Sequence, residues 1–317
     1  MSAPKGIPSV DLSDFLSGIE TKKMQFVADL GKAYEEIGFV AVRNHQIPDE
    51  LIDELYAKNK AFFELPKDVK KKYEIEGMGG QRGYTSFGKE HAKGMTECDL
   101  KEFWHFGQFV EDDEKRKATY PENVSVTEVS GYLETGKKAY QSFEKTGTEM
   151  LRAIALYLGI DENYFDKYVH NGNSILRPIH YPPVTDSSTK AVRAGAHEDI
   201  NLITLLVGAS ADGLQVLTKQ NEWVSVTSIQ DHIVVNVGDM LQRLTNNKLR
   251  STTHRVINPV EAKQGTSRYS VPFFLHPVSE MPLNCLEETI DENHPKAYSD
   301  ITAGDYLTER LKEIGLM

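Results

Sequence analysis

The sequence predicts a mainly β protein with flanking helices, built on a double-stranded β-helix (jelly roll) core. After residue 171 the chain consists of short Val-, Ile-, Leu- and Thr-rich segments separated by Gly, Asn, Asp and Pro. Such segments are typical of strands joined by turns, and about eight of them in succession are typical of a double-sheet jelly roll. The predicted strands are 175–181, 192–197, 203–207, 214–217, 223–225, 232–236, 253–257 and 268–275.

A long helix is predicted to brace this core. Over residues 127–159 the apolar side chains form one stripe at helical spacing, which predicts one long helix or a broken pair. The stripe consists of Tyr132, Gly136, Ala139, Phe143, Gly147, Met150, Ile154 and Tyr157. A glycine inside a helix costs about 1 kcal/mol relative to alanine. The glycines on the stripe therefore indicate that another element packs very close to the helix backbone.

The first 170 residues alternate helices with single strands, which predicts an N-terminal α/β region packed on the core. Apolar residues at helical spacing predict a helix that begins at Thr21 and is capped by Gly38, and a second helix over 49–63. The basic run 67–72 is predicted to be the solvated face of a helix. The strands predicted for this region lie near Val10, at 39–42 and at 99–105.

The predicted parts of the chain are 1–170, the N-terminal α/β region; 171–280, the jelly-roll core; and 281–317, a C-terminal segment. The last part ends in a charged helix over 301–316 that begins near Thr302. The boundary near residue 170 is a change from helical to strand patterns. It is therefore interpreted as architectural rather than as a flexible linker.

Composition and charge argue against several classes of partner. The chain has 317 residues, 39% of them hydrophobic and 26% charged, as in an ordinary globular protein with a sizeable core. A formal net charge of −11 argues against a nucleic-acid or anionic-membrane partner. Only Cys98 and Cys285 occur, so no disulfide framework is expected and a reducing compartment fits. Neither an apolar signal segment nor a membrane-length apolar run is found, so a cytoplasmic location is expected.

The candidate site combines two histidines and an aspartate. His197 and Asp199 are two residues apart in a predicted extended segment, so their side chains can point to the same side. His254 follows 57 residues later in another predicted strand. Two imidazoles and one carboxylate on one face form a triad that holds Fe(II) and leaves coordination positions open. Arg268 and Ser270, again two apart, could hold an organic carboxylate in the same cavity by charge-assisted hydrogen bonds.

Two other motifs are incomplete. The pair His197-Glu198 begins the zinc-protease pattern His-Glu-x-x-His, but the pattern fails at Asn201. Residues 83–89 nearly form a phosphate-binding loop, but Glu90 stands where a Mg²⁺-binding Ser or Thr is needed. The sequence therefore predicts neither a zinc protease nor a nucleotide site, and residues 77–105 are expected to form part of a lid over the cavity.

The remaining polar residues receive structural assignments. Asn236 and Asp239 are predicted to fix a turn between strands rather than to take part in chemistry. The other histidines are assigned to structural or surface positions, with His105 and His180 as the two that could reach the pocket.

Several segments carry a family resemblance. They are HEDINLITLL (197–206), DGLQV (212–216), NVGD (236–239), RSTTHRVINP (250–259) and RYSVPFF (268–274), with IPSVDL (7–12) and GFVAV (38–42) near the start. In this order they resemble the motifs of the Fe(II)/2-oxoglutarate-dependent dioxygenases, in their isopenicillin N synthase-like branch. The resemblance covers nearly the whole chain.

The resemblance implies a set of roles. His197, Asp199 and His254 would be the metal ligands, and Arg268 and Ser270 would hold the distal carboxylate of 2-oxoglutarate. Tyr181 aligns with a tyrosine that often donates its hydroxyl to the same carboxylate. Members of the family often carry Asn two residues before that tyrosine, where this chain has Ile179, so that contact is expected to be absent.

The implied enzyme uses Fe(II), 2-oxoglutarate and O₂ to hydroxylate, desaturate or cyclise a small organic substrate. Isopenicillin N synthase itself uses no 2-oxoglutarate, and its Arg-x-Ser pair binds the substrate's carboxylate instead. Fragmentation of 2-oxoglutarate to ethylene is a further variant. A third alternative is a jelly-roll protein that binds metal and 2-oxoglutarate without turnover. The C-terminal sequence lacks the glutamine-containing tail of isopenicillin N synthase, which favours the 2-oxoglutarate enzyme.

Overall fold

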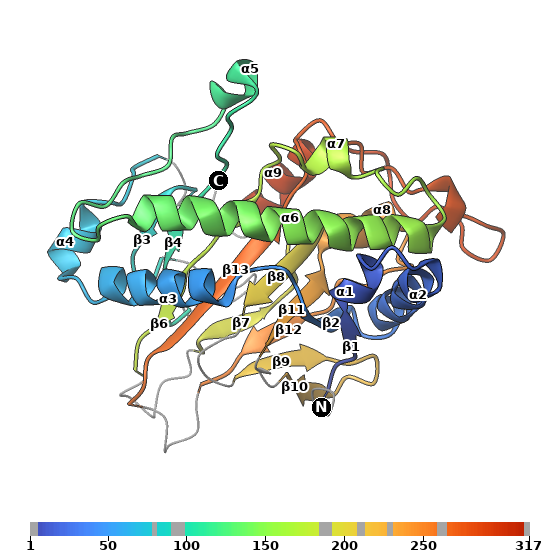
Figure 1. Ribbon diagram of the computed structural model, residues 1–317, viewed down its shortest axis with the longest axis horizontal. Coiled ribbons are helices and arrows are strands. Elements are labelled where there is room, and N and C mark those ends of the chain that lie inside the picture. Colours follow the sequence, from blue (N-terminus) through green and yellow to red (C-terminus); the bar gives the residue numbers. More distant parts are fainter. Residues whose placement is uncertain are drawn as a thin grey trace.

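The computed structural model describes residues 6–77, 81–89, 99–183, 192–207, 213–226, 231–258 and 265–313. Motif residues 212 and 259, and the end of the helix predicted over 301–316, lie outside this range. Two β-sheets form the core, and helices cover the outer face of the larger one (Figure 1). None of the helices in the described part of the chain combines the length and the apolar character needed to cross a bilayer.

The larger sheet joins strands from both halves of the chain. Its order is β1 (Ser9–Asp11), β2 (Phe39–Arg43), β11 (His232–Val237), β8 (Ile203–Val207), β13 (Arg268–Leu275), β6 (Ile179–Tyr181), β4 (Glu102–His105) and β3 (Gly83–Thr85), with β5 (Ile175–Leu176) also paired to β13. The N-terminal strands therefore extend the sheet at both edges. The division into 1–170, 171–280 and 281–317 stays a prediction.

The smaller sheet completes the jelly roll. Its order is β10 (Trp223–Ser225), β9 (Leu214–Leu217), β12 (His254–Val256) and β7 (Ala194–His197), all antiparallel. From β6 onward the chain alternates between the two sheets, except that β9 and β10 form an antiparallel pair within the smaller one, and this alternation is typical of a double-stranded β-helix. The predicted strands after residue 171 are confirmed, except that 175–181 is divided into β5 and β6. Pro178 lies at the division, because a proline cannot donate a hydrogen bond to the ladder.

The predicted helices of the N-terminal half are confirmed within a few residues. The described helices are α1 (Leu12–Phe15), α2 (Glu20–Glu36), α3 (Asp49–Phe63), α4 (Lys67–Lys71), α5 (Glu114–Lys117), α6 (Tyr132–Leu158), α7 (Asp166–Val169), α8 (Asp239–Leu244) and α9 (Ala303–Glu313) with a 3₁₀ turn at Glu287–Thr289. α2 ends before Gly38, whose φ of +71° suits a residue without a Cβ atom.

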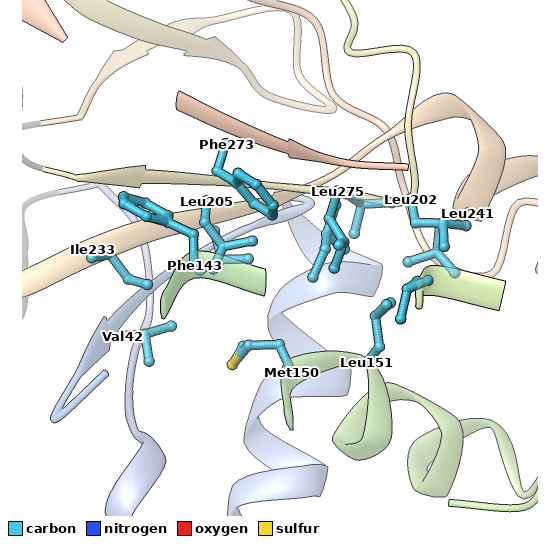
Figure 2. Packing of buried hydrophobic residues seen from close by; sticks show 14 of the residues in the cluster. Val42, Phe143, Met150, Leu151, Leu202, Leu205, Ile233, Leu241, Phe273 and Leu275 are labelled. Carbon is cyan, nitrogen blue, oxygen red and sulfur yellow. The ribbon is translucent and has the colours of Figure 1, made fainter. Parts of the chain in front are cut away.

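The bracing helix α6 lies across the larger sheet (Figure 1). Phe143, Met150 and Leu151 of α6 face side chains from β8, β11 and β13 in one buried cluster (Figure 2). Each fully buried side chain of this kind contributes roughly 1.5–3 kcal/mol. A Cβ at Gly136 would lie 2.5 Å from Phe106, and one at Gly147 would lie 2.7 Å from Leu275. The expected close approach to the helix backbone is therefore confirmed.

Alternation along the strands determines what faces the jelly-roll interior. The odd-numbered residues of β8, β11 and β13 pack in the core beneath α6: Ile203, Leu205, Val207, Ile233, Val235, Val237, Val271, Phe273 and Leu275. Because successive side chains of a strand point to opposite faces, the even-numbered residues face the smaller sheet. Thr204, Asn236 and Ser270 are thereby directed into the space between the two sheets.

The prediction that the basic run 67–72 is solvated agrees with exposed Lys67, Lys71 and Lys72 and is wrong at Lys70. Lys70, in the basic run 67–72, is only 7% exposed rather than solvated. Its Nζ lies 2.8 Å from the carboxylate of Glu102 on β4 and donates to the backbone oxygen of Phe63. The pattern of local charges contained no sign of this buried partner, which lies 32 residues further along the chain.

Candidate active site

The three predicted ligands lie close together at one end of the neighbouring strands β7 and β12 of the smaller sheet. His197 on β7 and His254 on β12 are direct partners in the antiparallel ladder, and their ring centroids lie 4.4 Å apart. Asp199 lies just after β7, with its Oδ1 3.9 Å from His197 Nε2 and 3.7 Å from His254 Nε2. The three ligand atoms lie within 4.8 Å of one another, which is close enough to share one ion.

The imidazoles are oriented by the backbone. His197 Nδ1 lies 2.7 Å from the carbonyl oxygen of Gly195, and His254 Nδ1 lies 3.1 Å from that of Thr252. Because a carbonyl oxygen only accepts, each Nδ1 must carry the proton and donate it. The lone pair of each Nε2 is then left facing Asp199, as a metal ligand requires.

Asp199 is held through its other oxygen. Thr204 Oγ1 donates to Asp199 Oδ2 at 2.7 Å, and Asn236 Nδ2 donates to the same oxygen at 2.8 Å. Asn201 Nδ2 in turn donates to Thr204 Oγ1 at 2.8 Å. Oδ1 thus remains directed at the histidines. The assignment of Asn236 to a turn is wrong, because it lies within β11 and its side chain supports the carboxylate.

His197 and Asp199 have the protonation states that a bound metal cation requires. Burial, followed by the proximity of His254, lowers the pKa of His197 to about 4. Burial alone would raise the pKa of Asp199, but the two histidines and its hydrogen bonds outweigh burial and hold it below its usual value. A neutral imidazole and a carboxylate at neutral pH are the ligand forms that bind a divalent ion. Two nitrogens and one oxygen on one side fit Fe(II), with the opposite side open.

The predicted carboxylate anchor lies on two neighbouring strands. Arg268 of β13 pairs directly with Tyr181 of β6, and its guanidinium carbon lies 4.8 Å from the centre of the Tyr181 ring. Ser270 lies two residues further along β13, on the same face as Arg268. All three side chains are buried, and Arg268 is only 1% exposed. This brings a permanent positive charge and two hydroxyl groups into an enclosed space.

Sequence reasoning missed a second arginine in this region. Arg193, just before β7, is completely buried, and its guanidinium carbon lies 6.0 Å from the centre of the Tyr181 ring. A signal was present, since a charged residue within a predicted inner strand requires a reason to be buried.

A cavity of about 1090 Å³ opens beside His197 and Asp199. Phe103 and His105 on β4 form part of one wall, and Leu307 on α9 belongs to another. Residues 78–80 and 90–98 of the expected lid lie outside the described range, but its described residues 77, 81, 82, 84, 85, 89, 99, 101, 103 and 105 line the cavity.

The two histidines singled out earlier have different places. His105 lines the cavity. His180 instead belongs to a buried polar network, with Nδ1 2.7 Å from Glu102 and Nε2 3.0 Å from Ser267 Oγ. Its ring also stacks on Tyr269, with centroids 4.7 Å apart. His180 thus supports the segment that leads into Arg268.

Two family models match the chain. The model described as non-haem dioxygenase in morphine synthesis N-terminal matches residues 7–128, and the 2OG-Fe(II) oxygenase superfamily model matches residues 172–277. The chain is 30% identical to the 2-oxoglutarate-Fe(II) type oxidoreductase hxnY of Emericella nidulans, over 98% of this chain and 91% of that protein. It is 32% identical to the proline hydroxylase buaE of Petromyces alliaceus, over 96% of this chain and 98% of that protein.

Solved structures share the fold over nearly their full length. A 2OG-Fe(II) oxygenase family protein from Caulobacter crescentus is 40% identical with a TM-score of 0.88, covering 98% of this chain and 99% of that one. A full-length Neurospora crassa protein, solved in complex with alpha-KG (2-oxoglutarate), is 32% identical with a TM-score of 0.85, covering 96% of this chain and 95% of that one. The same Neurospora crassa protein has also been crystallised with alpha-KG and thymine.

Proposed function

The chain belongs to the 2OG-Fe(II) oxygenase superfamily, and we propose that His197, Asp199 and His254 are the residues that bind its Fe(II). It is a 2-oxoglutarate- and Fe(II)-dependent dioxygenase that uses O₂. The ligand assignment rests on one observation: two imidazole nitrogens and one carboxylate oxygen all lie within 4.8 Å of one another. When bound, iron and 2-oxoglutarate supply the oxidising chemistry, in which the cosubstrate is decarboxylated to succinate and CO₂ while the substrate is oxidised.

Arg268, Ser270 and Tyr181 are assigned to the distal carboxylate of 2-oxoglutarate. A buried carboxylate needs a permanently charged partner with forked donors, which arginine provides. The hydroxyl groups of Ser270 and Tyr181 can donate to the same carboxylate. Ile179 stands where relatives often have asparagine, so this part of the pocket offers the cosubstrate an apolar surface instead of an amide.

The rest of the site orients the reactants and excludes water. The hydrogen bonds of Thr204 and Asn236 fix the Asp199 carboxylate, and the carbonyl oxygens of Gly195 and Thr252 fix the two imidazoles. Hydrogen bonds of this kind fix the orientation of the ligand groups, which reduces the reorganisation needed during reaction. An apolar cluster lies beside Arg268 and helps to exclude water from its guanidinium group. It consists of Phe103, Ile179, Tyr181, Ala194 and Val256.

The substrate is proposed to be a small organic molecule that is hydroxylated, desaturated or cyclised. The cavity of about 1090 Å³ is large enough for such a molecule beside the cosubstrate. One relative is named a proline hydroxylase, and another was crystallised with thymine. The matches to 2-oxoglutarate enzymes do not favour an oxidase without 2-oxoglutarate. Membership of the isopenicillin N synthase-like branch is part of the proposal, and the cytoplasmic location stays a prediction.

An anaerobic titration of the Fe(II) protein with 2-oxoglutarate tests the assignment. Chelation should produce a visible charge-transfer band whose growth gives the affinity. Arg268→Met should weaken 2-oxoglutarate binding by about 2–5 kcal/mol, because a buried charge partner is lost. Arg255→Met is the matched control, since Arg255 lies on β12 with its guanidinium 3.9 Å over the Trp223 ring. An unchanged affinity in Arg268→Met would remove the carboxylate assignment.

A further inference from the structure

Arg193 has donors that nothing in the described structure satisfies. Its side chain is 0% exposed, and its Nη2 donates to the backbone oxygen of Thr266 at 2.9 Å. Its Nε and Nη1 are buried without a hydrogen-bond partner in the described structure. A buried donor without a partner is costly, because it has given up its hydrogen bonds to water and gained none in return. Arg193 is therefore an unsatisfied cation inside the fold.

The surroundings of Arg193 favour an anion as the partner of these donors. The Tyr181 ring lies close to both guanidinium groups, 6.0 Å from that of Arg193 and 4.8 Å from that of Arg268. Burial first, and then the charge of Arg268, lower the pKa of Arg193. Two buried like charges beside one ring repel each other, and an anion bound by both of them would offset that repulsion.

The chain geometry ties Arg193 to the carboxylate anchor. Arg193 holds the carbonyl of Thr266, which is two residues before Arg268 on the segment entering β13. On the other side, Ala194 belongs to the apolar cluster that contains Tyr181. The unpaired donors of Arg193 thus belong to a side chain that lies near the same Tyr181 ring as Arg268 does.

We propose that Arg193 is a second guanidinium for the distal carboxylate of 2-oxoglutarate, an inference that rests on the proposed function of Arg268. A carboxylate has two oxygens with about four lone-pair sites, enough to accept from two arginines and a hydroxyl. Binding would satisfy the orphaned donors and neutralise part of the repulsion together. Arg193 is then a specificity-determining residue, which favours 2-oxo acids with a second carboxylate over those with only one.

Binding of two different 2-oxo acids distinguishes a carboxylate-binding role of Arg193 from a purely structural one. The probes are 2-oxoglutarate and 2-oxobutyrate, which has the same chelating end but no distal carboxylate. Each is titrated anaerobically into the Fe(II) forms of the wild type, Arg193→Met, Arg193→Lys and the control Arg255→Met. Thermal unfolding of each ligand-free protein is measured alongside, because relief of repulsion in Arg193→Met should leave the melting temperature unchanged or higher.

Replacement of Arg193 is expected to weaken the binding of 2-oxoglutarate but not that of 2-oxobutyrate. Arg193→Met should bind 2-oxoglutarate at least tenfold more weakly than the wild type, while 2-oxobutyrate binding changes less than twofold. Arg193→Lys keeps the charge without the fork, so a loss of about three- to tenfold is expected. This variant carries the test if the methionine variant does not fold. Arg255→Met should match the wild type with both ligands.

Other outcomes overturn the inference. If the Arg193 variants lose equal affinity for both 2-oxo acids, Arg193 does not act on the distal carboxylate, because 2-oxobutyrate has none. Unchanged 2-oxoglutarate affinity in both Arg193 variants, with a lower melting temperature without ligand, would make Arg193 a purely structural residue. If Arg268→Met weakens 2-oxoglutarate and the Arg193 variants do not, only this inference falls. If Arg268→Met has no effect either, the proposed carboxylate site falls with it.

Discussion

Asn236 Nδ2 donates a hydrogen bond of 2.8 Å to Asp199 Oδ2, the oxygen turned away from the two histidines. Thr204 donates to the same oxygen, so Asp199 Oδ1 is the atom left for a metal. Loss of a partner of this kind typically lowers metal affinity by about 10- to 100-fold. β11 and β8 are neighbours in the larger sheet, and Asn236 pairs directly with Thr204. The Asp199 carboxylate, a proposed iron ligand, is thus positioned by the sheet opposite the one that carries the histidines.

Asn236→Ala should weaken Fe(II) binding by about 10- to 100-fold, because the carboxylate loses one of its two orienting donors. The dissociation constant measured anaerobically by isothermal titration calorimetry checks this. Asn163→Ala, at an exposed asparagine, is the control and should bind as the wild type does. Wild-type affinity in Asn236→Ala would mean that Thr204 alone fixes the carboxylate.

Tyr181 offers two separable contributions, its hydroxyl and its ring. Tyr181→Phe removes one donor and should weaken 2-oxoglutarate binding by about 0.5–1.5 kcal/mol. Tyr181→Leu also removes the ring face near the guanidinium groups of Arg193 and Arg268, and should cost more. Titration with 2-oxoglutarate measures both. Equal affinities for the two variants would show that the ring contributes nothing beyond its hydroxyl.

The sequence was most informative where a function depends on local spacing. His197 and Asp199 are two apart beside a strand, so alternation alone placed them on one side. The strands β8, β9, β10 and β13 were predicted with their observed bounds, because turn residues separate their β-branched and apolar runs. His254 was found from its motif, and the ladder between β12 and β7 explains why it is opposite His197.

Roles that depend on a distant partner were not predictable in this way. Lys70 looked like a surface lysine because its partner Glu102 lies on another element. Asn236 looked like a turn residue because only the pairing of β11 with β8 brings it to Asp199. Arg193 was recognisable only as a charged residue in a predicted inner strand, and its place near the Tyr181 ring that Arg268 also contacts follows from the closure of the two sheets. Pairing between remote strands is the information that local patterns lack.

The buried pair of Lys70 and Glu102 gives a test of stability away from the chemistry. Lys70→Met removes the cation and leaves Glu102 inside the fold with Tyr84 and His180 as its remaining partners. The free energy of unfolding should fall by about 3–5 kcal/mol, as expected for an uncompensated buried charge. Urea denaturation measures it, with exposed Lys71→Met as the control. The double variant with Glu102→Gln should recover part of the loss, and no recovery would contradict the charge explanation.

Glu144 on α6 predicts how stability depends on pH. Burial raises its pKa from 4.5 to about 7, while nearby His170 acts in the opposite direction. The folded protein therefore keeps a proton on Glu144 that the unfolded chain releases between about pH 4.5 and pH 7. The stabilisation associated with this proton is present below pH 4.5 and is lost as the pH rises through about 7.

Glu144→Gln removes this titration and should flatten the pH dependence of unfolding. Relative to the wild type, the variant should become more stable as the pH is raised from about 5 to about 8, because it no longer has to bury a carboxylate. Urea denaturation at both pH values measures the difference. Glu134→Gln, at an exposed position on the same helix, should show the pH dependence of the wild type. If Glu144→Gln follows the wild-type curve at both pH values, the side chain is hydrated in the folded protein and its pKa is not raised.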